Sequence, residues 1–227
     1  MPTGEKLTVP TGEKLTVPTP DKLTVPTSDR TASWRLAKII TDVLSPAVLV
    51  AGLLLAVAWH AARTPSQAIV MGSLAASAAS IIPISYIVRG VRQGRWTNHH
   101  VTVREQRRLP LLVCLVSTLV GTLLLYAVHA PRELVALIAS MVASLAVAWP
   151  ITMLLRWKVS VHALVAAGAA GALAVVFTPV VLIAMVPIAA AVCWSRVRLN
   201  DHSTGQVAVG AVIGLAATVG LFPALLG

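Results

Sequence analysis

A polar stretch near the carboxyl end of the chain lies between two apolar segments. It covers residues 195–206 and contains Arg196, Arg198, Asp201 and His202. Charged and ionisable groups placed against a membrane are energetically expensive, and they are usually kept there for function. Guanidinium groups form paired, charge-assisted hydrogen bonds with phosphate oxygens. The stretch is therefore a candidate anion-binding site.

Two further polar stretches precede apolar segments. One contains Lys158, Ser160 and His162 and leads into a segment rich in Ala and Gly. The other covers residues 98–110, and its basic residues are Arg104, Arg107 and Arg108. Basic side chains near helix amino termini, whose dipoles favour anions, are what a phosphate site requires. For residues 98–110 the simpler interpretation is a basic loop that only fixes the orientation in the membrane.

The composition predicts an all-α, polytopic transmembrane helix bundle of about six to seven helices. Of 227 residues, 57% are hydrophobic and only 11% are charged, and the mean hydropathy of +0.83 is far above that of ordinary water-soluble domains. A bilayer core about 30 Å thick takes roughly 17 to 25 helical residues to cross. The predicted spans cover residues 36–61, 66–88, 110–129, 132–155, 162–178, 180–195 and 205–226.

The order of these spans predicts that the three polar stretches meet. Two spans separate residues 98–110 from the stretch around Lys158, and two more separate that stretch from residues 195–206. An even number of crossings returns the chain to the same face of the membrane. Most basic residues fall on this face, so the positive-inside rule places it, together with the amino terminus, in the cytoplasm. The expected location is the plasma membrane.

Residues 1–31 form a separate region. Residues 2–9 recur as residues 10–17 and, with changes, as residues 18–25. A proline at the start of every repeat prevents a regular helix or central strand. The sequence therefore predicts a disordered octapeptide-repeat tail, followed by a membrane domain over residues 32–227.

The spacing Ser-Arg, five residues, His, three residues, Gln at positions 195–206 resembles the third motif of the type 2 phosphatidic acid phosphatase superfamily. In that family the arginine binds a phosphate and the histidine attacks the phosphorus. The resemblance implies that Arg196 binds phosphate and that His202 forms a phosphohistidine. Many members have Asp where this chain has Gln206. A glutamine carbonyl can still accept the ring N–H and fix the tautomer, and this variant resembles dolichyl diphosphatases.

The stretch around Lys158 resembles the second motif of the same family, Pro-Ser-Gly-His. Ser160 and His162 keep their places, while Val159 and Val161 replace the proline and the glycine. The resemblance implies that Ser160 and Lys158 help to bind the phosphate. It also implies that His162 protonates the leaving oxygen and then activates water.

The first motif of the family, Lys, six residues, Arg-Pro, is not matched. Position 101 is Val, and Leu109 intervenes before Pro110. A basic cluster that ends in proline at a helix start remains. Only the phosphate-binding role is therefore carried over, to Arg104, Arg107 and Arg108.

The resemblance implies a metal-independent phosphatase of an amphiphilic lipid phosphate, without a cofactor. A polyprenyl (di)phosphate, phosphatidic acid and phosphatidylglycerol phosphate all fit a site at the membrane face. No metal site is expected, because His99 and His100 are adjacent in the chain and no Cys or carboxylate set lies near them. Nucleic acid is not an expected partner despite the net charge of +10, because no basic segment is joined to an exposed aromatic platform.

Two other functions remain compatible with the sequence. The same helices could carry a transferase or cyclase that uses a prenyl diphosphate, or a non-catalytic transporter or lipid-binding protein. In the last case the arginines would tolerate exchange for lysine and no histidine would be essential. The sequence leaves the oligomeric state open.

Overall fold

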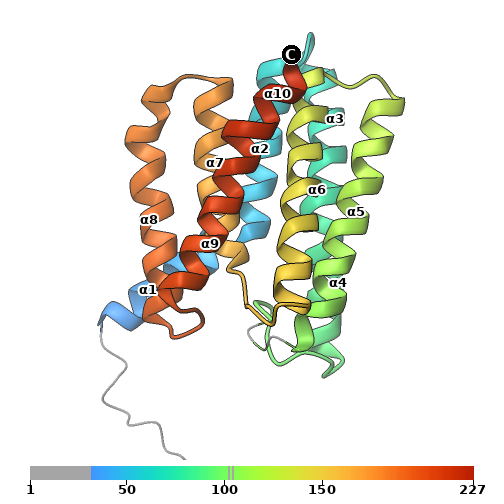
Figure 1. The fold of residues 1–227 in the computed structure, drawn as a ribbon. Coiled ribbons are helices and arrows are strands. Elements are labelled where there is room, and N and C mark those ends of the chain that lie inside the picture. Colours follow the sequence, from blue (N-terminus) through green and yellow to red (C-terminus); the bar gives the residue numbers. More distant parts are fainter. Residues whose placement is uncertain (1–31, 102, 104) are drawn as a thin grey trace, which may run out of the picture.

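The computed structural model describes residues 32–101, 103 and 105–227, so the repeats predicted to form a disordered tail lie outside it. The described residues are mainly helical and contain no strand, which confirms the predicted all-α class (Figure 1). The α-helices are α1 (Ala32–Val43), α2 (Pro46–Ala61), α3 (Pro65–Ala76), α4 (Ile82–Arg92), α5 (Arg108–Ala127), α6 (Arg132–Met153), α7 (Val161–Val176), α8 (Leu182–Arg198), α9 (Thr204–Leu215) and α10 (Phe222–Leu226).

Short helical segments of other types join some of these helices. The π-helical segments η2 (Ser77–Ile81) and η5 (Ala216–Leu221) connect α3 to α4 and α9 to α10, so each of these pairs runs on as one helix. The 3₁₀ turns η3 (Glu105–Arg107) and η4 (Pro179–Val181) precede α5 and α8.

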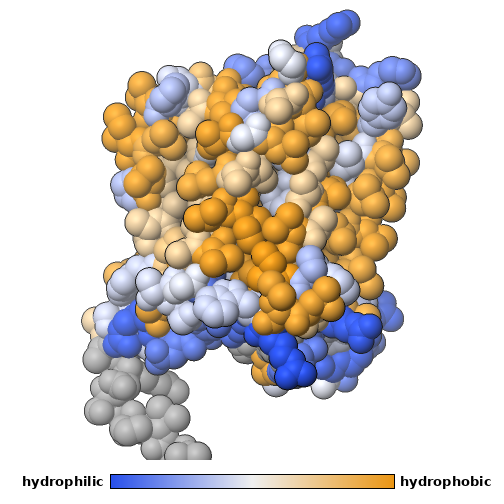
Figure 2. Space-filling model, viewed as in Figure 1, coloured by the Kyte–Doolittle hydropathy of each residue, from blue (hydrophilic) through white to orange (hydrophobic). Residues whose placement is uncertain are grey.

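The chain is a multi-pass membrane protein. Among the described residues, five helical segments are long and apolar enough to cross a membrane, namely Pro65–Arg92, Glu105–Ala127, Arg132–Met153, Pro179–Arg198 and Thr204–Leu226. α1 and α2 add a sixth if they count as one span bent by 44°. On the face shown in Figure 2, an apolar belt lies between polar residues at the two ends of the bundle. Large apolar side chains such as Leu123 and Ile183 are exposed in this protein, as lipid-facing residues should be.

Two of the seven predicted spans differ from the structure. The predicted span over residues 36–61 is broken before Pro46, which begins α2. Proline lacks the amide hydrogen that would continue the preceding helix, and it is favoured in the first turn of a new one. The predicted span over residues 162–178 is the 16-residue α7, which is shorter than the roughly 20 residues that a full crossing takes.

α7 lies at the centre of the bundle and packs against α2, α8 and α9. Its small side chains let α9 come very close. A Cβ atom on Gly210 would collide with the carbonyl oxygen of Ser160, and one on Gly214 with that of Leu164. Because the two backbones touch, the amide of Ser160 lies 3.2 Å from the carbonyl oxygen of Gln206. The second and third polar stretches are thereby joined.

The three polar stretches lie at the same end of the bundle, as the even number of crossings predicts. Their connections, residues 93–107, 154–160 and 199–203, share this end with α1 (Figure 1). Side-chain hydrogen bonds link them directly, from Arg107 to Val159 and from Lys158 to Asp201.

Candidate active site

His202 lies in the short connection between α8 and α9 and is 5% exposed. Its Nδ1 lies 3.2 Å from Gln206 Oε1 and 3.3 Å from the carbonyl oxygen of Lys158, and its Nε2 lies 3.2 Å from Arg107 Nη2. Both partners of Nδ1 are acceptors, whereas a guanidinium can only donate. The proton therefore belongs on Nδ1. The lone pair of Nε2 points toward Arg107.

Gln206 fixes this tautomer while it also caps α9. Its Oε1 accepts a hydrogen bond from the amide of Ser203, and the Ser203 hydroxyl accepts one from the amide of Gln206, which together form a capping box. The bond from the Ser203 amide identifies Oε1 as the atom that faces His202. Gln206 thus holds the imidazole from a rigid position in the first turn of α9.

The surroundings of His202 favour its neutral form. Burial lowers the pKa of His202 to about 3, and the positive charges of Arg107, Lys158 and Arg196 act in the same direction. The imidazole is therefore unprotonated at Nε2 across the physiological pH range. A neutral imidazole with an unprotonated ring nitrogen is the form that can act as a nucleophile.

Arg107 joins the first polar stretch to the other two. It is 5% exposed, and besides its contact with His202 it donates from Nε to the carbonyl oxygen of Val101 at 2.8 Å and from Nη1 to that of Val159 at 2.9 Å. Val101 has a φ of 45°, a left-handed conformation that is unfavourable for a β-branched residue. Such strain persists only where surrounding contacts hold it, and it is frequent at functional sites.

Of the other two basic residues predicted in this stretch, Arg108 does not join the cluster. Arg108 is exposed at the start of α5 and does not line the cavity described below. Its side chain follows that of Arg107 by one position on a helix, so it points in a different direction. Arg104 lies outside the described residues.

Arg196 is fully buried at the end of α8. Its Nη2 lies 2.7 Å from Asp201 Oδ2, with the distance of an ion pair but not the alignment of a hydrogen bond, and its Nη1 donates to the Thr41 hydroxyl at 3.4 Å. Its carbonyl oxygen accepts hydrogen bonds from the amides of Asp201 and His202. Arg196 therefore also shapes the loop that presents His202. Its Nε has no hydrogen-bond partner among the described residues, but the side chain is fully buried and does not line the cavity described below. The predicted phosphate-binding role of Arg196 stays a prediction.

Lys158 lies beside His202, and its Nζ donates to the carbonyl oxygen of Asp201 at 2.6 Å. Burial lowers the pKa of Lys158 to about 8, and the charge of Arg107 lowers it further than the charge of Asp201 raises it. The ammonium group has two more hydrogens to donate. Its positive charge is lost as the pH rises through about 8.

Ser160 and His162 have different positions at the start of α7. The Ser160 hydroxyl is buried and accepts a hydrogen bond from the amide of Ala163 as the N-cap of the helix. His162 is 5% exposed, and its Nε2 has no hydrogen-bond partner among the described residues. A buried, unpaired ring nitrogen is costly. His162 is therefore the one predicted histidine with a nitrogen still available for a ligand.

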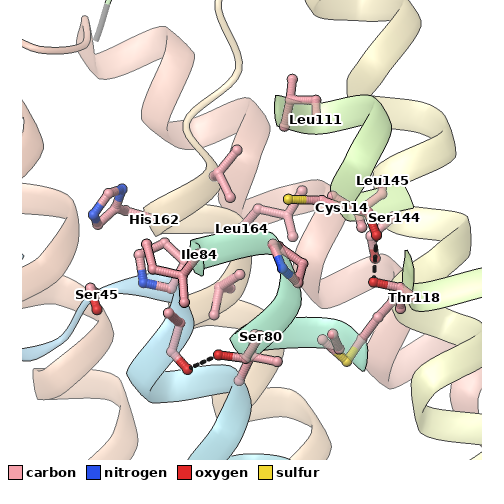
Figure 3. A pocket seen from close by; sticks show the side chains of 18 of the residues that line it. Ser45, Ser80, Ile84, Leu111, Cys114, Thr118, Ser144, Leu145, His162 and Leu164 are labelled. Atoms are coloured by element: carbon pink, nitrogen blue, oxygen red, sulfur yellow. Dashed lines mark hydrogen bonds between the residues drawn. The ribbon is translucent and has the colours of Figure 1, made fainter. Parts of the chain in front are cut away.

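A cavity of about 340 Å³ begins at this polar end and continues into the bundle (Figure 3). Its polar end is lined by Asp42, His99, His100, Arg107 and His162. His202, Arg196 and Lys158 do not line it. The cavity therefore meets the histidine and arginine cluster through Arg107 and His162.

The deeper part of the cavity is apolar. It is lined by residues such as Leu53, Leu137 and Ala169. Hydroxyl groups also occur there, but those of Ser80, Thr118 and Ser144 donate to main-chain carbonyl oxygens. Their hydrogens are thus turned away from a ligand, and the cavity suits a hydrocarbon chain.

Two residues at the polar end of the cavity are absent from the sequence-based site. Asp42 comes from α1 and reaches His100 across the bundle, which no local pattern indicates. His100 lies seven positions before Arg107 in the same polar stretch, but no pattern in the sequence singles it out.

A scan against protein-family models and searches of curated proteins and of solved structures found no match for this chain.

Proposed function

We propose that this chain is a membrane lipid phosphatase that removes phosphate from a polyprenyl (di)phosphate or a related phospholipid through a phosphohistidine. The observation that carries the proposal is the buried, neutral His202, with Nδ1 held by Gln206 and Nε2 facing Arg107. The resemblance to the type 2 phosphatidic acid phosphatase superfamily at residues 195–206 supports the same role.

In the proposed reaction the phosphate binds at the polar end of the cavity and displaces the Arg107 side chain from His202, which opens Nε2 to the phosphorus. Arg107 Nη2 then donates to a phosphate oxygen instead of His202 Nε2, and the guanidinium and the Lys158 ammonium stabilise the charge that develops on the oxygens. Nε2 attacks the phosphorus, a P–N bond forms, and the P–O bond to the lipid breaks. The positive charge that develops on the imidazole is partly offset by the side-chain oxygen of Gln206 and the main-chain carbonyl oxygen of Lys158, which both accept hydrogen bonds from Nδ1–H.

His162 is the proposed proton donor and acceptor. Its Nε2 lies unpaired beside the cavity, where the bond to the lipid oxygen would break. In this mechanism His162 enters the first step protonated and gives its Nε2 proton to that oxygen. The neutral ring then takes a proton from the water that cleaves the P–N bond, which restores its protonated form as phosphate is released. Ser160 acts by capping α7 and fixing the position of this histidine, which refines its predicted role in phosphate binding.

The setting supports an amphiphilic substrate. The phosphate would bind at the polar end of the cavity and the tail in its apolar part. We favour a polyprenyl (di)phosphate because Gln206 follows the variant of the third motif that resembles dolichyl diphosphatases.

Product analysis tests the proposal directly. Detergent-purified protein is incubated separately with farnesyl diphosphate and with phosphatidic acid in the presence of EDTA. Release of phosphate with an intact prenol supports the phosphatase. A change in the carbon skeleton would instead indicate the transferase or cyclase, and no product with either lipid would favour the transporter or lipid-binding protein.

The proposed location is the plasma membrane, with the end of the bundle that carries the three polar stretches on the cytoplasmic side. The support is the excess of arginine and lysine in the connections at that end. Asn98→Cys lies in the connection after α4, and Arg132→Cys is at the first residue of α6, at the opposite end of the bundle. A membrane-impermeant thiol reagent added outside intact cells should label the second and not the first, and the reverse pattern would invert the orientation.

The pH dependence of kcat/KM should reflect the loss of a proton from Lys158. Because its pKa is about 8, kcat/KM should fall as the pH rises through about 8, where the ammonium loses its proton and its attraction for phosphate. In Lys158→Arg the decline should move to higher pH, since a guanidinium stays charged. Lys38→Arg, at an exposed lysine, is the matched control. An unchanged profile in Lys158→Arg would remove Lys158 from the phosphate site.

The cavity can be tested with the two cysteines of the chain. Cys114 lines the cavity and Cys193 on α8 does not. Cys114→Trp should lower kcat/KM for a long-chain prenyl phosphate by about 10-fold or more while leaving a short-chain, water-soluble phosphate ester unaffected. Cys193→Trp should not discriminate between the substrates. Equal losses for both substrates in Cys114→Trp would show that the tail binds elsewhere.

A further inference from the structure

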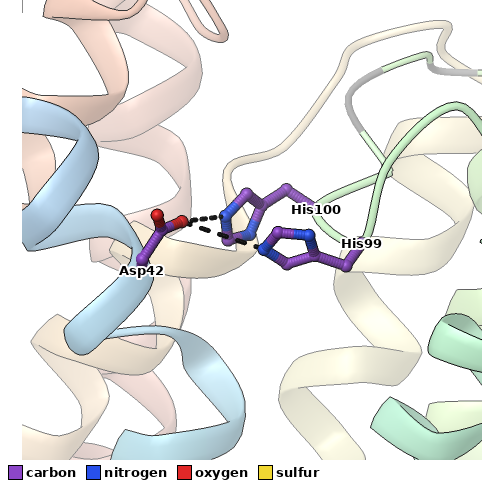
Figure 4. Close-up of side chains that lie close together, drawn as sticks. All are labelled: Asp42, His99 and His100. Carbon is purple, nitrogen blue, oxygen red and sulfur yellow. Dashed lines mark hydrogen bonds and ion pairs between the residues drawn. The ribbon is translucent and has the colours of Figure 1, made fainter.

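Three potential metal ligands converge at the rim of the cavity (Figure 4). His99 and His100 come from the connection after α4, and Asp42 comes from α1. His100 Nε2 lies 2.9 Å and His99 Nε2 lies 3.8 Å from the same oxygen, Asp42 Oδ1, and all three ligand atoms lie within 4.8 Å of one another. The sequence-based argument against a metal site, that no carboxylate lies near the two histidines, is therefore wrong on this point.

We propose that Asp42, His99 and His100 bind a divalent transition-metal ion of the zinc class. Two imidazoles and one carboxylate suit Zn²⁺ and its neighbours, whereas Mg²⁺ and Ca²⁺ prefer oxygen ligands alone. Tetrahedral Zn²⁺ with bonds of about 2.0–2.2 Å separates neighbouring ligand atoms by about 3.3–3.5 Å. The distances of 2.9 and 3.8 Å lie on either side of this value, and the two histidine nitrogens lie within 4.8 Å of each other. Side-chain shifts of up to about 1 Å therefore complete the tetrahedral geometry.

The surroundings of the three ligands hold two of them in place. Lys38 Nζ donates to Asp42 Oδ2 at 3.0 Å, which leaves Oδ1 directed at the histidines. The His100 ring packs edge-on against His162, with 5.1 Å between the ring centroids. Partners of this kind orient metal ligands and commonly accompany them. His99 is about half exposed, which gives an ion access from solvent.

Three protein ligands leave one tetrahedral position open. That position lies at the polar end of the cavity, which Asp42, His99 and His100 line together with His162. An ion bound there would reduce access to His162 and would hold His100 Nε2. Zn²⁺ should therefore inhibit the proposed phosphatase reaction, in which no metal takes part.

Metal binding is measured on the full chain in detergent, purified without a histidine tag. Co²⁺ serves as the spectroscopic probe and Zn²⁺ as the ligand in calorimetry. The wild-type protein should bind one Zn²⁺ per chain, and its Co²⁺ complex should show the visible absorption bands of a four-coordinate site. His99→Ala should weaken binding by at least 100-fold, beyond the roughly 10–100-fold that outer-shell changes cost.

Two further variants keep the test decisive. Asp42→Asn preserves an acceptor for His100 but removes the charge, and it should also weaken Zn²⁺ binding strongly. His129→Ala, at the opposite end of the bundle, is the matched control and should bind as the wild type does. Unchanged Zn²⁺ affinity in both His99→Ala and Asp42→Asn, or no saturable binding by the wild type at sub-millimolar Zn²⁺, would overturn the site.

The inhibition rests on the proposed function, but the binding measurements do not. Zn²⁺ should slow turnover by the wild type and lose this effect in His99→Ala. If Zn²⁺ binds and no phosphatase activity exists, only the proposed function fails. If activity exists and Zn²⁺ inhibits both proteins equally, the inhibitory role of the site fails.

Discussion

His202→Ala should abolish turnover of lipid phosphates while the protein remains folded. The side chain supplies the proposed nucleophile, and loss of a nucleophile typically costs on the order of 10⁴-fold or more in kcat. Its hydrogen bonds run to Arg107, Gln206 and a main-chain carbonyl, and none of these is part of the apolar core. Turnover is measured as phosphate release, and folding as the thermal unfolding temperature in detergent.

A second measurement separates the nucleophile from a residue that only shapes the site. Wild-type protein quenched during turnover of a phosphate-labelled substrate should retain acid-labile, base-stable label, and His202→Ala should retain none. His129→Ala is the control for loss of a histidine. Turnover by His202→Ala near the wild-type rate would end the phosphohistidine mechanism.

Gln206 variants probe the same step more finely. Gln206→Glu keeps the reach to His202 Nδ1 and adds a charge that stabilises the imidazolium, so activity should be preserved or rise. Gln206→Asp is shorter by one methylene, so its carboxylate reaches Nδ1 less well and the gain should be smaller. Burial can also make a new carboxylate hold its own proton, which would appear as lower activity at acidic pH.

Arg107→Lys should have the second-largest effect, a loss of about 10²–10³-fold in kcat/KM, as expected for removal of a donor that stabilises developing charge. One guanidinium reaches Val101, Val159 and His202 at once, whereas an ammonium on a flexible stem cannot hold the same fork. The lost main-chain bonds should also lower the unfolding temperature. Both quantities are measured on the same purified sample.

Arg108→Lys is the matched control, since Arg108 is the next residue and is exposed. It should retain activity close to that of the wild type. The substrate should also protect against thermal unfolding in the wild type and much less in Arg107→Lys. A loss in Arg108→Lys as large as that in Arg107→Lys would mean that the basic loop acts through its net charge and not through Arg107.

Much of the architecture follows from the sequence because the bilayer sets the length of each spanning segment, and the number of crossings sets the face at which the chain emerges. Apolar segments of roughly 20 residues must cross, and an even number of crossings brings chain ends to one face. That reasoning alone brings Lys158, Arg107 and His202 together. It also survives the bend before Pro46 and the short α7, because neither changes the face at which the polar stretches emerge.

The details of the site depend on packing that a linear pattern does not encode. Arg107 and Arg108 are chemically identical neighbours, and only the direction in which η3 and α5 place them makes one buried and the other exposed. Asp42 lies far from His99 and His100 in the chain and approaches them only because α1 bends away from α2 at 44°. The sequence shows that α9 contains glycines, but it does not show that Gly210 and Gly214 pack against the main chain of α7 and its N-cap.

The shortness of α7 has a consequence for the connections at its ends. Sixteen residues span about 24 Å at 1.5 Å per residue, about 6 Å less than a typical hydrocarbon core. Because α7 is enclosed by α2, α8 and α9, the bilayer need not thin around it. The connections at its ends can instead lie at the depth of the hydrocarbon while they remain buried in protein.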